Sequence, residues 1–200
     1  MPTNNTGSIV KELHEKYPDK IALLNNPFSI KKPIKRHAYD NGCYTKFDVV
    51  KYFEGLIKLR LGYEKGFWEK PMFVVCPDVV GDHHRTLSLW HLYSPQIKAF
   101  GFPIAFVAQD GCTPQSVPFD ANWIFVGGND PWKMESVHLF IGNRPVHVGR
   151  VNGIGRLKTC LELGVTSCDG TGWLRQRNKQ FYDFLEYFEG EKQRGLFNAM

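Results

Sequence analysis

Apolar segments of strand length alternate along nearly the whole chain with segments whose apolar residues recur at helical spacing. The predicted strands cover residues 21–24, 37–40, 72–76, 103–108, 123–126, 145–148 and 165–169. The predicted helices cover residues 10–17, 45–61, 82–97, 130–141 and 152–164, and a last helix contains residues 181–188. The strands are apolar on both faces, as in a parallel sheet covered by helices. The pattern predicts an α/β fold and leaves a doubly wound sheet and a barrel as alternatives.

Cap signals delimit several of the predicted helices. Thr45, with Asp48 three residues later, resembles a capping box. Asp130 followed by Pro131 combines a cap residue with proline at the first helical position. Gly164 is suited to end the helix that precedes the last strand, because glycine often follows a helix C-terminus. The remaining predicted N-caps are Asp82 and Asn152.

The composition adds broad limits. The chain has 200 residues, which favours a single globular domain over residues 1–200 but is short for a closed eight-stranded barrel of about 250 residues. The net charge of +5 is a weak indication of a polyanionic partner. Five cysteines, an odd number without zinc-ligand spacing, predict reduced thiols in a cytoplasm-like compartment.

Some classes of protein are disfavoured by what the sequence lacks. It contains no apolar run of membrane-spanning length and no signal peptide, so we expect a cytoplasmic protein without membrane partners. No P-loop and no Gly-x-Gly-x-x-Gly motif follows a predicted strand. This argues against a nucleotide-cofactor enzyme, and we expect no cofactor.

Polar residues and glycines follow most of the predicted strands. If the strands are parallel, these groups converge on one mouth at the carboxyl ends of the strands. A carboxylate can accept hydrogen bonds from the N1–H and amino groups of guanine, and a carboxamide or a glycine N–H can donate to its O6. Tyr44 can stack on such a base. The groups at the strand ends are Asp40, Asp78, Gln109, Gly127-Gly128, Gly149 and Asp169.

Six short segments, each at a predicted strand end, occur in an order that matches a known family. They are Asp40-Asn-Gly-Cys-Tyr44, Cys76-Pro-Asp78, Ala108-Gln109-Asp-Gly, Phe125-Val-Gly-Gly128, Val148-Gly149, and Asp169 with Arg175 six residues later. On these segments, which run from about residue 40 to 175, the chain resembles the tRNA-guanine transglycosylase superfamily. Within it, the chain is most similar to the compact 7-deazaguanine DNA transglycosylases of phages and bacterial DNA-modification systems.

The resemblance implies a (β/α)8 TIM-like barrel and a pentosyltransferase activity. Guanine in DNA would be replaced by a 7-deazaguanine of the preQ0 type through a covalent aspartyl-glycosyl intermediate, without a metal. Asp169 would be the nucleophile and Asp40 the acid and base, as in a retaining glycosidase. The implied base-binding residues are Asp78, Gln109, Gly127, Gly128, Tyr44 and Gly149.

Two departures from the family limit this interpretation. The Cys-x-Cys-x-x-Cys…His zinc site of the tRNA enzymes is absent, so the zinc-binding subdomain is missing and a DNA substrate is favoured. The proline and threonine before the family's arginine are Trp173 and Leu174 here. An RNA-acting enzyme and a non-catalytic base-binding subunit remain alternatives. The presence of both Asp40 and Asp169 argues against the non-catalytic subunit.

The expected partners are DNA with its target guanine flipped out and the free 7-deazaguanine base. Whether the chain forms a homodimer stays open. Arg175 is a predicted phosphate contact by resemblance. Basic residues of the loop before the second strand are also candidate phosphate contacts, against the alternative of a solvated surface. They are Lys31, Lys32, Lys35 and Arg36.

Other conspicuous residues have simpler interpretations. His83 and His84 are predicted surface residues at a helix start, and His147 a structural histidine with satisfied hydrogen bonds. Cys168, although next to Asp169, is predicted to be a small buried residue without thiol chemistry. The sequence leaves open whether Trp173 inserts into DNA or packs inside the protein.

Overall fold

The computed structural model describes residues 8–30, 35–170 and 179–197. Within them, the strands form one parallel sheet in sequence order, so the predicted α/β fold with parallel strands is confirmed. The strands are β1 (Leu23–Asn25), β2 (His37–Tyr39), β3 (Val74–Val75), β4 (Ile104–Ala108), β5 (Trp123–Val126), β6 (Val146–Val148) and β7 (Ser167–Cys168).

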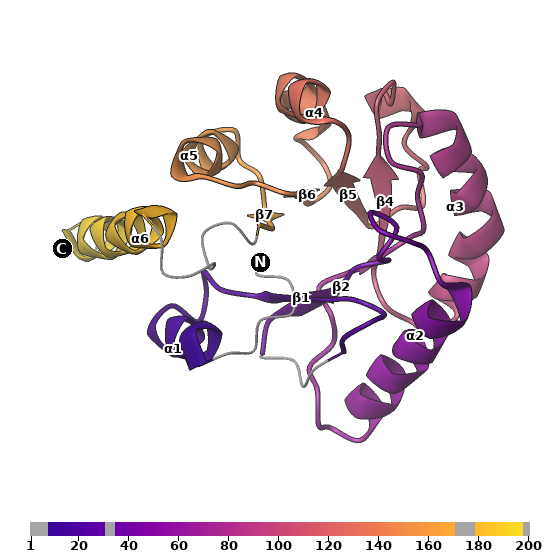
Figure 1. Cartoon of the computed structure of the whole chain (residues 1–200), viewed down its shortest axis with the longest axis horizontal. Helices are drawn as coiled ribbons and strands as arrows, with labels where there is room; N and C mark the ends of the chain where they lie inside the picture. The colour runs from indigo at the N-terminus through magenta and orange to yellow at the C-terminus, as the bar shows by residue number, and fades with distance from the viewer. Residues whose placement is uncertain (1–7, 31–34, 171–178, 198–200) are drawn as a thin grey trace.

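Helices follow or precede the strands around the outside of the curled sheet, as Figure 1 shows. None of the described helices is long and apolar enough to cross a membrane. The α-helices are α1 (Ser8–Lys16), α2 (Val49–Glu64), α3 (His83–Lys98), α4 (Asp130–Ser136), α5 (Ile154–Glu162) and α6 (Lys179–Phe197). Two short 3₁₀ helices are η1 (Pro114–Ser116) and η2 (Val137–Phe140).

The described part of the sheet is a half-barrel that does not close. Strands β1 and β7 are its two edges, and the described residues contain seven strands. A closed ring of eight would need one more strand between these edges. The chain between β7 and α6 includes residues 171–178, which lie outside the described residues.

The two faces of the sheet bury different apolar clusters because successive side chains of a strand point to opposite sides. In β4, Ile104, Phe106 and Ala108 belong to the large cluster that includes helix residues. Ala105 and Val107 belong to a smaller cluster formed mainly by residues of neighbouring strands. Burial on both faces explains why polar and apolar residues do not alternate along the strands. Polar side chains are therefore found mainly where the strands end.

One predicted helix start is confirmed and others shift. The Asp82 side chain accepts a hydrogen bond from the backbone N–H of Arg85 at the start of α3, as predicted. At α2 the prediction of Thr45 was wrong, because Asp48 accepts from the third residue of the helix and Thr45 lies in the preceding turn. The caps of α4 and α5 differ by one residue from the predicted Asp130 and Asn152, and are Asn129 and Gly153.

We predict that Gly55→Ala destabilises the protein although alanine is favoured over glycine in helices by about 1 kcal/mol. A Cβ at this position of α2 would collide with the hydroxyl of buried Tyr39, which donates to the carbonyl of Tyr52 at 3.1 Å. Overpacking of this kind costs about 1–3 kcal/mol. Urea denaturation should therefore show a lower free energy of unfolding than for the wild type.

Gly155→Ala is the matched control in another helix. No described atom lies within 4 Å of the Cβ that this change would add in α5. Its free energy of unfolding should stay the same or rise by up to about 1 kcal/mol. Equal stabilities of the two variants would contradict the tight packing of α2 on β2.

Candidate active site

A cavity of about 410 Å³ lies at the carboxyl ends of the strands. It is lined by groups from the ends of β2, β3, β4, β5, β6 and β7. The parallel order of the sheet thus brings together side chains that are far apart in the sequence. The lining residues that the sequence singled out are Asp40, Tyr44, Asp78, Gln109, Gly127, Gly149 and Asp169.

Other predicted site residues lie elsewhere. Gly128 does not line the cavity, and its carbonyl accepts a hydrogen bond from Arg150 at 2.7 Å. Lys35 and Arg36 precede β2, so they lie at the amino end of the sheet, opposite the carboxylates. The Arg36 guanidinium donates to the carbonyl of Asp19 at 2.5 Å. The predicted phosphate contacts that fall outside the described residues are Arg175, Lys31 and Lys32.

Asp40 follows β2, and its backbone N–H donates to the carbonyl of Asn25 on β1 at 2.7 Å. Burial raises the pKa of its carboxyl to about 7, and the negative charges of Asp169 and Asp78 act in the same direction. Backbone N–H groups of Asn41 and Gly42 only partly oppose this rise. Near neutral pH the Asp40 carboxyl can therefore both donate and accept a proton.

Asp78 is held by two side-chain amides. Asn41 Nδ2 donates to its Oδ1 at 2.6 Å, and Gln109 Nε2 donates to its Oδ2 at 2.5 Å. Burial raises the pKa of Asp78 despite these two hydrogen bonds. Gln109 is fixed in turn, because its Oε1 accepts from the backbone N–H of Gly81 at 2.9 Å. Asn41 was missed by sequence reasoning, although it lies next to Asp40 in the same segment.

Gly127 and Gly149, two of the glycines that line the cavity, provide space rather than donors. The N–H of Gly127 donates to Ala108 at 2.9 Å and the N–H of Gly149 donates to Val126 at 3.1 Å, both within the sheet. A Cβ on Gly127 would lie 2.8 Å from the Gln109 amide nitrogen, and one on Gly149 would lie 2.7 Å from the Phe125 ring. The expected donation from Gly127 to a ligand is therefore not available in this arrangement.

Asp169 follows β7 and is buried at the wall of the cavity. Its Oδ1 accepts from His147 Nε2 at 3.1 Å and from the backbone N–H of Arg150 at 3.2 Å. His147 Nδ1 lies 2.8 Å from the hydroxyl of Ser167. The network is satisfied when His147 carries its proton on Nε2 and Nδ1 accepts from Ser167.

This pair has a defined charge state. Burial lowers the pKa of His147, so its imidazole is neutral at neutral pH. For Asp169 burial acts to raise the pKa, but the hydrogen bonds from His147 and from the backbone N–H of Arg150 act to lower it, and its pKa is lowered overall. Neutral imidazole still donates one hydrogen bond, so an anionic Asp169 beside a neutral His147 is the state that we infer.

His147 is fully buried, with its ring centroid 5.1 Å from that of Phe73 and 4.6 Å from that of Phe125. The sequence predicted a satisfied structural histidine and missed its contact with Asp169. The available signal was its alternation with Val146 and Val148, which places it on the opposite face of β6. That face is the inner one, where the cavity lies.

Two cations near the site were also missed. Arg150 lines the cavity, and its guanidinium carbon lies 4.7 Å from the ring centroid of Tyr44. Lys133 is fully buried behind the site, where its Nζ donates to the carbonyl of Gly149 at 2.8 Å and to Asp130 at 2.9 Å. A lysine in a short amphipathic helix is normally exposed, so the sequence offers no signal for this role.

The histidines and Cys168 need limited corrections. His83 is 6% exposed and its ring lies edge-on to Phe106, so the prediction of a surface residue was wrong, whereas His84 is exposed. Cys168 is half-buried, and burial raises the pKa of its thiol.

Trp173 lies outside the described residues. Within them, no group of three or more His, Cys, Asp or Glu could hold a metal ion.

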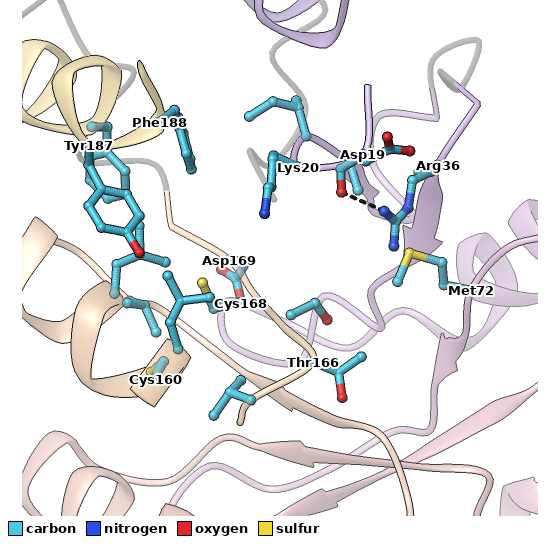
Figure 2. A pocket seen from close by; sticks show the side chains of 18 residues that line it. Asp19, Lys20, Arg36, Met72, Cys160, Thr166, Cys168, Asp169, Tyr187 and Phe188 are labelled. Atoms are coloured by element: carbon cyan, nitrogen blue, oxygen red, sulfur yellow. Dashed lines mark hydrogen bonds between the residues drawn. The ribbon is translucent and has the colours of Figure 1, made fainter. Parts of the chain in front are cut away.

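A second cavity of about 460 Å³ lies between the two edges of the sheet. Figure 2 shows Tyr187 and Phe188 of α6 on one side of it and Arg36 and Met72 on the other. Asp169 lines both cavities. Of the polar groups that meet at the carboxyl ends of the strands, the second cavity has Asp169 but lacks Asp40, Asp78 and Gln109.

Comparison of the chain with protein-family models and with curated proteins finds no match. The geometry of the cavity therefore carries the functional argument.

We predict that Asp169→Asn lowers the pKa of Asp40. The charge of Asp169 raises this pKa now, so its removal makes ionisation of Asp40 easier. In a carboxyl ¹³C NMR titration, the midpoint of the Asp40 transition, expected at about pH 7 in the wild type, should move to lower pH. Asp120→Asn, a change near η1 and away from the cavity, should leave it in place. An unchanged Asp40 titration in Asp169→Asn would show that the two carboxyls do not interact.

Proposed function

We propose that the chain is a base-exchange transglycosylase that replaces guanine in DNA with a 7-deazaguanine of the preQ0 type. The observation that carries the proposal is one cavity with two carboxyls whose pKa values are shifted in opposite directions. Asp40 has a pKa of about 7, while that of Asp169 is lowered. Titratable pairs whose environments separate their pKa values indicate an acid–base residue and a nucleophile.

The half-barrel supports a compact TIM-like architecture for the whole chain. In such barrels the catalytic residues come from the carboxyl ends of several strands. The cavity has this position, and its volume of about 410 Å³ is within the usual range of roughly 300–1,000 Å³ for small-molecule sites. A purine-sized base is a suitable ligand for such a volume.

In the first half-reaction, a carboxylate oxygen of Asp169 attacks C1′ of the target deoxyguanosine. Both hydrogen bonds that described residues donate to the Asp169 carboxylate fall on Oδ1, which leaves Oδ2 as the attacking atom. The C1′–N9 bond breaks, its electron pair goes to the base, and protonated Asp40 supplies a proton. Guanine leaves, and the sugar stays on Asp169 as a glycosyl ester.

In the second half-reaction, a 7-deazaguanine occupies the vacated position. Asp40, now a carboxylate, removes the N9 proton, and N9 attacks C1′. The ester bond breaks and Asp169 is released as a carboxylate, while Asp40 is again protonated. Two displacements at C1′ retain its configuration, as in a retaining glycosidase. Both catalytic groups return to their starting states.

The base would be read by groups that are already fixed. A carboxylate can accept from the N1–H and amino group of guanine while each of its oxygens also accepts from a protein amide. Asn41 and Gln109 hold Asp78 in this way before a ligand arrives. Tyr44, which is 67% exposed at the mouth, offers a surface for stacking. A duplex base must first leave its stack to reach these groups.

We predict that Asp169→Asn abolishes exchange and the covalent adduct, because an amide cannot form the glycosyl ester. Asp40→Asn should form the adduct slowly, since the loss of general acid–base help costs about 10²–10⁴-fold. Labelled guanine incorporation measures exchange, and a denaturing gel detects the DNA adduct. A denaturant-resistant adduct with Asp169→Asn would exclude Asp169 as the nucleophile.

The assay should offer duplex DNA, single-stranded DNA and tRNA in parallel. Incorporation into tRNA alone would replace the DNA proposal with the RNA-acting alternative. Guanine binding by calorimetry without exchange on any nucleic acid would indicate the non-catalytic base-binding alternative. Asp78→Ala provides a contrast, because it should weaken base binding while Asp169 stays intact.

We predict that His147→Phe shifts the acid side of the pH–rate profile to higher pH. The hydrogen bond from His147 lowers the pKa of Asp169, so its loss raises the pH needed to ionise the nucleophile. His147→Gln keeps a donor near the Nε2 position and should lie closer to the wild type. Equal profiles for the wild type and His147→Phe would show that His147 does not act through Asp169.

A further inference from the structure

Arg150 has an unusual backbone conformation. Among the described non-glycine residues it is the one with a positive φ, of 57°. This left-handed conformation is rare outside glycine, asparagine and aspartate, and such strained residues cluster at functional sites. In this conformation the backbone N–H and the side chain of Arg150 point to different parts of the site. The backbone N–H reaches Asp169 Oδ1 at 3.2 Å, while the side chain extends along the cavity wall.

The guanidinium of Arg150 is held by two contacts, but most of its N–H donors have no acceptor among the described residues. Its NH2 group donates to the carbonyl of Gly128 at 2.7 Å, and the described residues accept no other hydrogen bond from it. Its guanidinium carbon lies over the ring of Tyr44, 4.7 Å from the centroid. Tyr44 follows β2 and Arg150 follows β6, so the pair bridges two distant parts of the cavity wall. The remaining N–H donors can form a bidentate contact with a ligand.

The cavity is lined by three aspartates, and Arg150 provides a positive charge among them. Asp40, Asp78 and Asp169 line it, and Arg150 is the cationic side chain among its described lining residues. A nucleoside within a DNA strand carries phosphodiesters on both sides, and carboxylates repel them. Lys35 and Arg36 precede β2 and do not line this cavity. A half-exposed guanidinium at the mouth is suited to bind phosphate, because its fork matches phosphate oxygens.

We propose that Arg150 binds the phosphodiester next to the flipped-out nucleotide, with Tyr44 and the Gly128 carbonyl holding the guanidinium in place. The inference rests on the proposed exchange reaction and adds its nucleic-acid contact. Because the N–H of the same residue supports Asp169, phosphate binding is linked through one backbone unit to the position of the nucleophile. The free base, which carries no phosphate, does not need this contact.

The test compares Arg150→Gln, Arg150→Lys and the wild type in the full-length chain. Gln and Lys both have a Cβ, so the backbone strain at this position is matched in all three proteins. Arg60→Gln is the control for a lost surface charge, because Arg60 lies on α2 and pairs with Glu64 at 2.7 Å. Binding of a single-stranded deoxyoligonucleotide with one guanine is measured by fluorescence anisotropy over a range of salt concentrations. Calorimetry with free guanine measures base binding.

Arg150→Gln should weaken oligonucleotide binding about tenfold to a hundredfold, the range for a lost hydrogen bond to a charged group. The log–log salt slope should become shallower by about 0.7, the value for one phosphate of a single strand. Arg150→Lys should keep most of the slope, Arg60→Gln should match the wild type, and guanine binding should be unchanged in every variant.

An unchanged salt slope in Arg150→Gln would overturn the inference. An equal loss of guanine and oligonucleotide binding would also overturn it, because Arg150 would then act on the base. If the wild type exchanged no base yet showed a slope that depends on Arg150, the proposed function would fail while the phosphate site stood. If the wild type exchanged the base but its salt slope did not depend on Arg150, the proposed function would stand and the phosphate site would fail.

Discussion

Three carboxylates around one cavity impose the main constraint on this structure. Like charges raise one another's pKa values and burial adds to the effect, whereas hydrogen-bond donors to the carboxylate lower its pKa. Asp169 has an imidazole N–H and a backbone N–H on Oδ1, and Asp78 has an amide donor on each oxygen. Among the described residues, Asp40 has only backbone donors that do not offset its burial, and its pKa rises to about 7. The pKa of Asp78 is also raised despite its two amide donors, so Asp169 is the carboxyl of the three whose pKa is lowered.

The supporting groups lie behind the cavity and come from different elements. Lys133 of α4 binds the carbonyl of Gly149 at the end of β6, where Arg150 begins its left-handed turn. The same turn brings the Arg150 N–H to Asp169. A buried lysine, a glycine and a strained arginine therefore fix one oxygen of the carboxylate. In the proposed reaction this carboxylate is the nucleophile, and a supporting shell that fixes a reacting group is usual in preorganised active sites.

The sequence predicted much of the fold and part of the candidate site. Apolar runs such as Trp123–Val126 coincide with an observed strand, because burial on both faces leaves a clear local signal. Polar residues directly after strands could be predicted to converge, since parallel strands end on one side. The contacts of His147 and Lys133 could not, because burial of a polar side chain depends on partners distant in sequence. Closure of the sheet beyond Asp169 was likewise not determined by periodicity, which is the same in open and closed sheets.

Positive charge shows most clearly why local sequence is insufficient for a binding surface. The basic run before β2 drew the prediction because four cations lie close together in sequence. The described members of this run, Lys35 and Arg36, precede β2 and therefore lie at the amino end of the sheet, whereas residues that follow the parallel strands lie at its carboxyl end. Arg150 stands alone in sequence but follows β6, so it shares the cavity with the carboxylates. Arg150 can therefore act on the three carboxylates directly from the cavity wall, whereas Lys35 and Arg36 do not line this cavity.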